Sequence, residues 1–189
     1  MDELKRRIVK DGQVLKGDIL KVDSFLNHQV DSLFMKRIGE EFARRFRTLK
    51  PTKILTAEIS GIAPALQAGV ALSIPVVFAR KIRPVTMTGK VYERHVPSRT
   101  KGGETLLLVS PDYLKAQDRV LILDDFLATG QTVNALANIV VEAGATLLGI
   151  GVLVEKSFEG GREALSEWDV PIVSLVTIER MNEREIVFR

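Results

Sequence analysis

The sequence predicts an α/β fold, with a central, mostly parallel sheet flanked by helices. Apolar runs of four to eight residues alternate along the chain with segments that have the apolar period of a helix. These runs are apolar throughout, as expected for strands that are buried on both faces. At 189 residues and 46% hydrophobic composition, the chain has the size of one domain, and we expect a single domain over residues 1–189.

The first half of the chain predicts two helices followed by one β–α–β unit. Asp31 precedes an apolar stripe at helical spacing and can cap that helix through its carboxylate. The expected elements are a helix at residues 2–10, an irregular segment at 12–27, the helix after Asp31, a strand at 53–57, a helix at 64–72 and a strand at 74–79.

The second half of the chain repeats this plan. A strand from residue 120, a helix up to residue 143 and a strand at 147–153 form a second unit, and further strands are expected at 171–176 and 186–188.

Residues 82–104 form a long connection without clear periodicity. Connections of this length in compact domains are usually functional, so we interpret it as a lid over a site, with a β-hairpin as the alternative for part of it.

The most informative segment begins at the strand at residues 120–123. Four apolar residues run directly into Asp124 and Asp125, and a loop of small and hydroxyl residues leads into a helix. The loop therefore lies where free backbone N–H groups and the positive end of a helix dipole attract an anion. We expect it to bind phosphate through Ala128, Thr129, Gly130, Gln131 and Thr132.

The two carboxylates indicate which phosphate ligand is bound. Because acids repel phosphate, Asp124 and Asp125 must face another group, and the vicinal hydroxyl groups of a ribose can donate to both. They also lie where a ribosyl ring develops positive charge. The loop has neither the lysine of an ATP-binding P-loop nor the three glycines of a dinucleotide fingerprint. The alternative is an ordinary turn that an Asp pair caps.

Other polar groups follow the ends of neighbouring predicted strands. The carboxyl ends of parallel strands meet at one edge of a sheet, and ligands bind there. A turn with Ser60 and Gly61 follows one strand, and a basic pair, Arg80 and Lys81, follows the next. The turn and the basic pair can both donate hydrogen bonds to a departing pyrophosphate. Lys156 lies at the end of a third predicted strand.

The segment resembles the phosphoribosyl-pyrophosphate signature of the type I phosphoribosyltransferases, which is an apolar run, Asp-Asp and a small-residue loop. Residues 20–29, 78–81 and 154–158 resemble the bacterial xanthine phosphoribosyltransferases, and the similarity covers essentially the whole chain. The neighbourhoods of Asn27 and Lys156 point to xanthine. In the loop at 82–104, Ser98, Thr100 and Lys101 fit the family pattern, but Pro97 stands where an aromatic residue is expected.

The resemblance implies the type I phosphoribosyltransferase fold, with a small hood over the base from about residues 1–30 and the C-terminal part. It implies transfer of a ribosyl 5-phosphate group from 5-phosphoribosyl 1-pyrophosphate to xanthine, giving xanthosine 5'-monophosphate and pyrophosphate in purine salvage. It also implies a homodimer, and Mg²⁺ that the substrate mainly holds. The base would contact Leu20, Asn27, Lys156 and Phe158, with Lys156 donating to the 6-carbonyl and Phe158 stacking on the ring.

The composition of the chain indicates its compartment and its kinds of partner. The chain has no cysteine and no apolar leader, so we expect a cytoplasmic protein without disulfides. A net charge of +3 suits polyanionic small molecules, and neither nucleic acid nor a membrane is an expected partner.

Guanine or hypoxanthine is the nearest alternative base, since both keep the 6-carbonyl. A regulator that senses phosphoribosyl pyrophosphate would need a DNA-reading element, for which the residues before the hood are too few.

Overall fold

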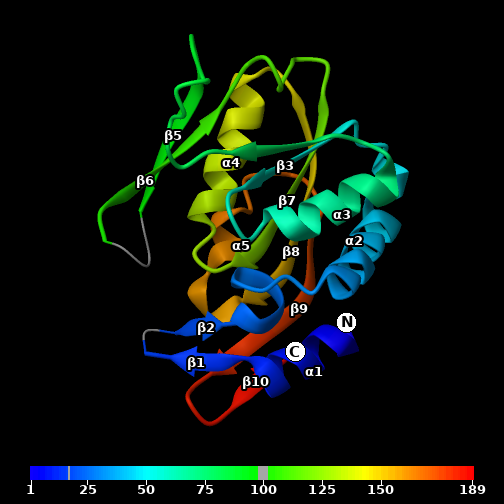
Figure 1. Ribbon diagram of the computed structural model, residues 1–189, viewed down its shortest axis with the longest axis vertical. Coiled ribbons are helices and arrows are strands. Elements are labelled where there is room, and N and C mark those ends of the chain that lie inside the picture. The colour runs from blue at the N-terminus through cyan, green and yellow to red at the C-terminus, as the bar shows by residue number, and fades with distance from the viewer. Residues whose placement is uncertain (17, 98–101) are drawn as a thin grey trace.

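The computed structural model describes residues 1–16, 18–97 and 102–189, and its centre is a six-stranded sheet with the order β10-β9-β8-β7-β3-β4 (Figure 1). All neighbours are parallel except β10, which pairs antiparallel with β9 at one edge. The α/β prediction is confirmed. The strands are β3 (Lys53–Ala57), β4 (Val76–Ala79), β7 (Arg119–Leu127), β8 (Thr146–Lys156), β9 (Ile172–Met181) and β10 (Ile186–Phe188).

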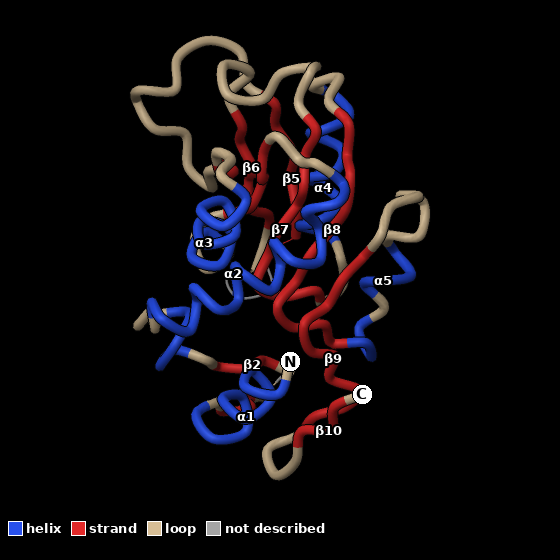
Figure 2. The backbone as a smooth tube through the Cα atoms, turned by 90° about the vertical axis from the view of Figure 1, so that its right-hand side faces the viewer, coloured by secondary structure: helices blue, strands red, loops and turns tan. Residues whose placement is uncertain are grey.

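Helices cover both faces of this sheet (Figures 1 and 2). α2 (Ser32–Phe46) and α3 (Ile62–Leu72) pack on one face and α4 (Gln131–Glu142) on the other, and each face has its own core. Strand β7 supplies both cores, because Leu121 and Leu123 lie in the first and Val120 and Ile122 in the second. This two-sided burial explains why the strand sequence is apolar throughout.

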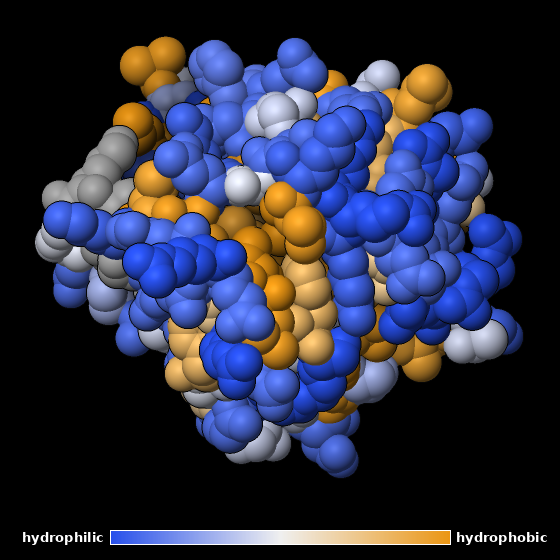
Figure 3. Space-filling model, turned by 90° about the horizontal axis from the view of Figure 1, so that it is seen from below, coloured by the Kyte–Doolittle hydropathy of each residue, from blue (hydrophilic) through white to orange (hydrophobic). Residues whose placement is uncertain are grey.

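The N-terminal elements lie at the lower end of the molecule, beside the C-terminus (Figure 1). The Met1 amino group donates to the Leu175 carbonyl oxygen at 2.9 Å, and Lys5 Nζ donates to the Arg189 carbonyl oxygen at 2.9 Å. Seen from below, this end carries a band of apolar side chains between polar ones (Figure 3). The elements are α1 (Asp2–Asp11), β1 (Gln13–Leu15), β2 (Ile19–Lys21) and the π-helix η1 (Asp23–Asn27).

A β-hairpin forms the later part of the long connection. β5 (Tyr92–Pro97) pairs antiparallel with β6 (Glu104–Val109), which confirms the hairpin alternative for that part. Ser98, Thr100 and Lys101, which fit the family pattern, lie outside the described residues. The remaining short helices are η2 (Arg47–Leu49), η3 (Ser157–Glu159) and α5 (Gly161–Ala164).

Several element bounds differ from the sequence prediction. α3 begins two residues before Pro64, because proline is tolerated in the first turn of a helix. β4 begins at Val76 because Ser73 is in the left-handed conformation (φ 58°) and ends the preceding helix. β7 continues to Leu127, so Asp124 and Asp125 lie inside a paired strand and not after it.

None of the helices in the described part of the chain has the length and apolar character needed to cross a bilayer.

The two helices on the first face approach closely at Gly39 of α2. A Cβ built there would lie 2.5 Å from the Ala68 nitrogen and from the Cβ of Gln67, both on α3. Since real Cβ atoms essentially never come so close, this position must be glycine for α2 and α3 to pack at this distance.

We therefore expect Gly39→Ala to destabilise the protein by about 1–3 kcal/mol, because the helices must separate. In an exposed helix the same change normally stabilises by about 1 kcal/mol. Thermal unfolding tests this, since each kcal/mol shifts the midpoint by about 2–4 °C in a chain of this size. The exposed neighbour Glu40→Ala is the matched control, and a Gly39→Ala midpoint at or above wild type would refute the packing argument.

Candidate active site

A cleft of about 450 Å³ opens at the carboxyl ends of β3, β7 and β8. Residues from the N-terminal segment, among them Leu20 of β2 and Asn27 of η1, also line it. The structure thus brings together most of the predicted site residues: Leu20, Asn27, Ser60, Lys81, Asp124, Asp125, Ala128, Thr129, Gly130, Gln131, Thr132 and Lys156.

The phosphate loop, defined here as residues 128–132, joins β7 to α4. Gly130 precedes α4 with a φ of 81°, a left-handed conformation that glycine adopts without strain. The first hydrogen bond of the helix runs from the Asn134 nitrogen to the Gly130 oxygen at 2.8 Å, and no side chain caps the helix. The preceding N–H groups therefore have no partner inside the helix, and an anion in the cleft can accept from them.

Asp124 is buried at the wall of the cleft, with 6% of its surface exposed. Its Oδ1 accepts a hydrogen bond from the Asp125 nitrogen at 3.1 Å. Burial raises the pKa of Asp124 well above its usual value, and the neighbouring Asp125 carboxylate raises it further. A carboxyl group held in this way gains from any ligand that brings hydrogen-bond donors or positive charge.

Gly61 makes room for this carboxyl group. A Cβ at Gly61 would lie 2.7 Å from Asp124 Oδ1 and would overlap the hydroxyl oxygen of Thr56. That hydroxyl is fully buried and has no hydrogen-bond partner among the described residues. Gly61 was predicted as a pyrophosphate contact, but it is not among the residues that line the cleft. The structure shows it shaping the space around Asp124 instead.

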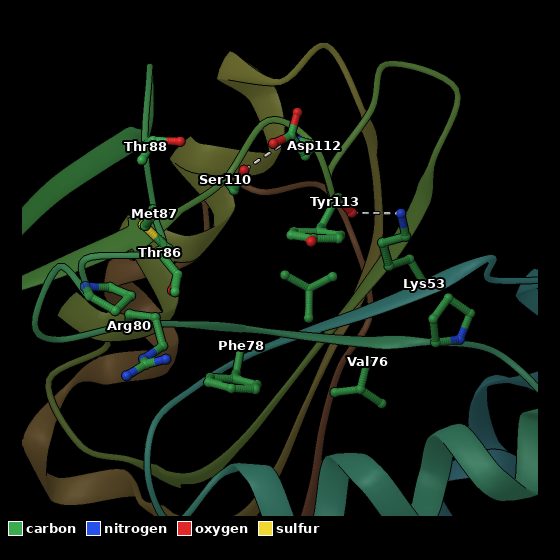
Figure 4. Close-up of a pocket in the computed structure, with 13 residues that line it drawn as sticks. Lys53, Val76, Phe78, Arg80, Thr86, Met87, Thr88, Ser110, Asp112 and Tyr113 are labelled. Carbon is green, nitrogen blue, oxygen red and sulfur yellow. Dashed lines mark hydrogen bonds between the residues drawn. The ribbon is translucent and has the colours of Figure 1, made fainter.

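Glu58 organises the basic turn after β4. One of its oxygens accepts from the Lys81 nitrogen at 2.5 Å, and the other pairs with Arg80 Nε at 2.9 Å. Glu58 and Lys81 line the cleft, whereas Arg80 does not. Arg80 lines a neighbouring pocket of about 570 Å³, where its guanidinium lies 5.7 Å from the ring of Phe78 (Figure 4). The structure therefore does not bring Arg80 to the predicted site.

Lys156, the last residue of β8, also lines the cleft and is 6% exposed. Its Nζ donates to the Asp18 carbonyl oxygen at 2.5 Å and pairs with Glu159 at 3.4 Å. The same Nζ lies 5.6 Å from the centre of the Phe126 ring. Lys156 is therefore a buried cation that joins the end of β8 to the turn between β1 and β2.

The aromatic residue among those that line the cleft is Phe126, which follows the acidic pair. Phe158, predicted to stack on a base, is 40% exposed in η3 and does not line the cleft. Asn27, at the end of η1, does line it. The predicted stacking by Phe158 thus has no geometric support, and Phe126 is the better placed ring.

Further cleft residues are ones to which the sequence analysis gave no role in the site. Residues 82–104 were predicted to form a lid over a site, and Val96 and Pro97 of that segment line the cleft. No sequence signal indicated that Thr105 and Leu107 of β6 line it as well. The additional lining residues are Ile19, Ala57, Glu58, Ile82, Val96, Pro97, Thr105, Leu107, Phe126 and Val133.

The side chains that line the cleft determine which metal ion it could hold. Among the described residues, no three histidine or acidic side chains converge as they would in a protein-built metal centre. Three carboxylates line the cleft, and while Glu58 is engaged with Lys81 and Arg80, Asp124 and Asp125 follow each other on β7. This set fits Mg²⁺ whose remaining ligands are oxygens of a phosphorylated substrate and water.

Comparison with known proteins shows the family of the chain. Residues 27–189 match the family model of the phosphoribosyl transferase domain. The chain is 52% identical to a xanthine phosphoribosyltransferase of Deinococcus deserti, covering 97% of this chain and 95% of that protein. It is 48% identical to a xanthine phosphoribosyltransferase of Listeria monocytogenes, covering 100% of this chain and 98% of that protein.

The fold is shared with more distant proteins. An adenine phosphoribosyltransferase from Thermoanaerobacter pseudethanolicus superposes with a TM-score of 0.75 at 24% identity, covering 93% of this chain and 98% of that chain. An adenine phosphoribosyl transferase from Trypanosoma brucei superposes with a TM-score of 0.74 at 21% identity, covering 97% of this chain and 88% of that chain. The family match and the close relatives both span most of the sequence, so the chain belongs to the family of phosphoribosyl transferase domain proteins.

Proposed function

We propose that this protein is a xanthine phosphoribosyltransferase of purine salvage. It transfers a ribosyl 5-phosphate group from 5-phosphoribosyl 1-pyrophosphate to xanthine and releases pyrophosphate. The observation that carries the proposal is that one cleft is lined by an uncapped helix N-terminus, an acidic pair and a buried lysine. These are the groups that a phosphorylated ribose and a carbonyl-bearing base need.

The phosphate loop supports binding of the 5-phosphate. Backbone N–H groups at the start of α4 and the hydroxyl groups of Thr129 and Thr132 donate to its oxygens. Asp124 and Asp125 then lie beside the ribose, where they accept from its hydroxyl groups. Lys81 and the turn at Ser60 lie at the end of the cleft suited to pyrophosphate.

In the reaction, a ring nitrogen of the base forms a bond to C1 of the ribose while the bond from C1 to the pyrophosphate oxygen breaks. The ring nitrogen loses its proton to solvent, and the pyrophosphate leaves with the electron pair of the broken bond. Positive charge develops on the ribosyl ring, and the nearby carboxylates stabilise it. Lys81 stabilises the negative charge on the leaving group.

Xanthine is the base that the cleft and the close relatives together favour. Lys156 can only donate, so it suits a 6-carbonyl and penalises a 6-amino group. Asn27 both donates and accepts, which suits the 2-carbonyl edge, and Leu20 and Phe126 give apolar contacts. Guanine and hypoxanthine share the 6-carbonyl, so the choice among the three depends on the 2-position. The named function of the 48–52% identical relatives favours xanthine.

Mg²⁺ belongs to this proposal as a substrate-bound ion. It supplies charge neutralisation on the pyrophosphate oxygens. Asp124 and Asp125, which line the cleft, would contact the ion or its water ligands. Omitting Mg²⁺ from the activity assay tests this requirement.

A homodimer and a cytoplasmic location complete the proposal. α3 exposes Leu66 (53%) and Val70 (68%) on the face away from α2, and such an apolar face suits a copy of the same chain. Sedimentation of the 21.0 kDa chain tests the dimer. The absence of cysteine fits a reducing compartment, and cell fractionation tests the location.

Incubation with phosphoribosyl pyrophosphate, Mg²⁺ and each purine in turn tests the function. We expect xanthine to give the highest kcat/KM and adenine to give almost none, because Lys156 cannot accept from an amino group. The measurement is release of pyrophosphate together with formation of the nucleotide. Turnover of adenine at the rate of xanthine would refute the base assignment, and no turnover with any base would refute the enzyme.

Asp124→Asn should have opposite effects on stability and activity. Because the folded pKa of Asp124 is raised, its ionisation destabilises the fold as the pH rises above the ordinary value of 3.8. We expect the variant to unfold at a higher temperature than wild type at pH 7–8, with the difference disappearing towards pH 3.8. Its kcat should fall about a hundred- to a thousandfold, the usual loss for one electrostatic group.

Thermal unfolding across this pH range and steady-state kinetics measure the two effects. Asp112→Asn, which lies in the neighbouring pocket, is the control for removing an acid elsewhere. A variant that is both fully active and no more stable than wild type would show that Asp124 only caps a turn.

Lys156→Ala should weaken xanthine binding about ten- to a hundredfold, the effect of losing a hydrogen bond from a charged group at roughly 1.5–3 kcal/mol. Discrimination against adenine should also shrink. Because Lys156 holds the turn at Asp18, some loss of stability is expected as well.

The control is Lys21→Ala, an exposed lysine of the same region that pairs with Asp23. Kinetics with xanthine and adenine distinguish the two variants. Unchanged KM and selectivity in Lys156→Ala would assign Lys156 to structure alone.

A further inference from the structure

The phosphate loop packs against a turn that the sequence analysis did not consider. This turn, Gly160–Gly161–Arg162, opens α5 and lies behind the loop. A Cβ at Gly161 would overlap the Ala128 carbonyl oxygen and would lie 3.0 Å from the Gly130 nitrogen. From the other side, a Cβ at Gly130 would lie 2.8 Å from the Gly161 oxygen. The two backbones are thus in contact, with no space for a side chain between them.

Arg162 anchors this turn to the sheet. Its Nε and one terminal nitrogen donate to the two oxygens of Glu155 at 2.8 and 2.6 Å. The other terminal nitrogen donates to the Ile172 carbonyl oxygen at 3.1 Å. Every guanidinium nitrogen therefore has a protein acceptor, and Arg162 does not line the cleft. A cation so close to a phosphate loop would be expected to bind the phosphate, but this one is committed to Glu155.

Glu155 is well suited to this role. It is 3% exposed at the end of β8, and Ser174 donates to it at 2.5 Å in addition to Arg162. Burial alone would raise the pKa of Glu155, but the hydrogen bonds from Arg162 and Ser174 outweigh it and lower the pKa. The carboxylate is therefore charged at neutral pH, and the pair forms a fixed point on the sheet.

We propose that Gly161 and Arg162 are positioning residues that hold the phosphate loop in its phosphate-binding shape through the contact of Gly161 with Ala128 and Gly130. This inference rests on the proposed function, since it assigns a substrate phosphate to the loop. The turn acts without touching substrate. Displacing the loop by a fraction of an ångström moves the donors at the start of α4 away from the phosphate oxygens, and binding of phosphate weakens.

Gly161→Ala is the direct test, because the methyl group must push the loop outwards. We expect the dissociation constant of ribose 5-phosphate, measured by calorimetry, to rise at least tenfold. The KM of phosphoribosyl pyrophosphate should rise similarly, whereas the KM of xanthine should change less than threefold. A merely structural residue would not separate the two substrates in this way.

Gly160→Asn is the matched control. Gly160 has a φ of 74°, which asparagine tolerates, and a Cβ there meets no atom within 4 Å. It changes the same turn without touching the loop, so ribose 5-phosphate binding should stay within twofold of wild type. Equal weakening by Gly160→Asn and Gly161→Ala would overturn the specific contact.

Arg162→Lys keeps the charge but loses the paired hydrogen bonds to Glu155, and it serves if Gly161→Ala does not fold. We expect it to weaken ribose 5-phosphate binding with little effect on the KM of xanthine. Wild-type affinity in the folded Gly161→Ala variant, or in Arg162→Lys where that variant does not fold, would overturn the proposal while leaving the proposed function intact. Absence of ribose 5-phosphate binding by the wild-type protein would overturn both.

Discussion

The parallel pairing of β7 with β8 is the constraint on which the rest of the site depends. After a register shift between Val120 and Leu121, the two strands pair as far as Leu127 opposite Glu155, so both run to the edge of the sheet together. The acidic pair, the start of the phosphate loop and Lys156 are thereby fixed on rigid backbone, and not on a free loop. Groups that must act on two ends of one substrate need this fixed separation, because positional errors of an ångström cost large factors in rate.

The cleft also shows where function opposes stability. Asp124 is buried beside a second carboxyl group, Thr56 has a buried hydroxyl without a partner among the described residues, and Gly61 gives up a side chain to make room. Each of these features destabilises the ligand-free fold. In the proposed function, ribose hydroxyl groups and developing positive charge would enter the cleft and satisfy the two carboxyl groups. The hydrophobic cores, one on each face of the sheet, offset this loss of stability.

The sequence was sufficient to predict the sheet and the placement of the acidic pair and its loop at one site, because both depend on local signals. Apolar runs, the helix after Gly130 and the acidic pair are contiguous in the chain and have a direct physical interpretation. Arg80 and Phe158 show the limit of such reasoning. Both lie near strand ends as expected, but Glu58 and Phe78 hold Arg80 in the neighbouring pocket, and η3 leaves Phe158 outside the cleft. Side-chain direction depends on distant partners, which neither composition nor spacing reveals.

The end of β8 shows how one strand can serve both ends of the site. Successive side chains of a strand point to opposite faces, and Glu155 and Lys156 accordingly have different partners. Lys156 contacts the turn at Asp18 and the ring of Phe126, whereas Glu155 binds Arg162 and Ser174 behind the phosphate loop. Two adjacent residues of opposite charge thus join one rigid strand end to the turn at Asp18 and to the turn that opens α5. Movement of this strand end would displace both turns together. If the base and the phosphate bind as proposed, the sheet itself sets the distance between them.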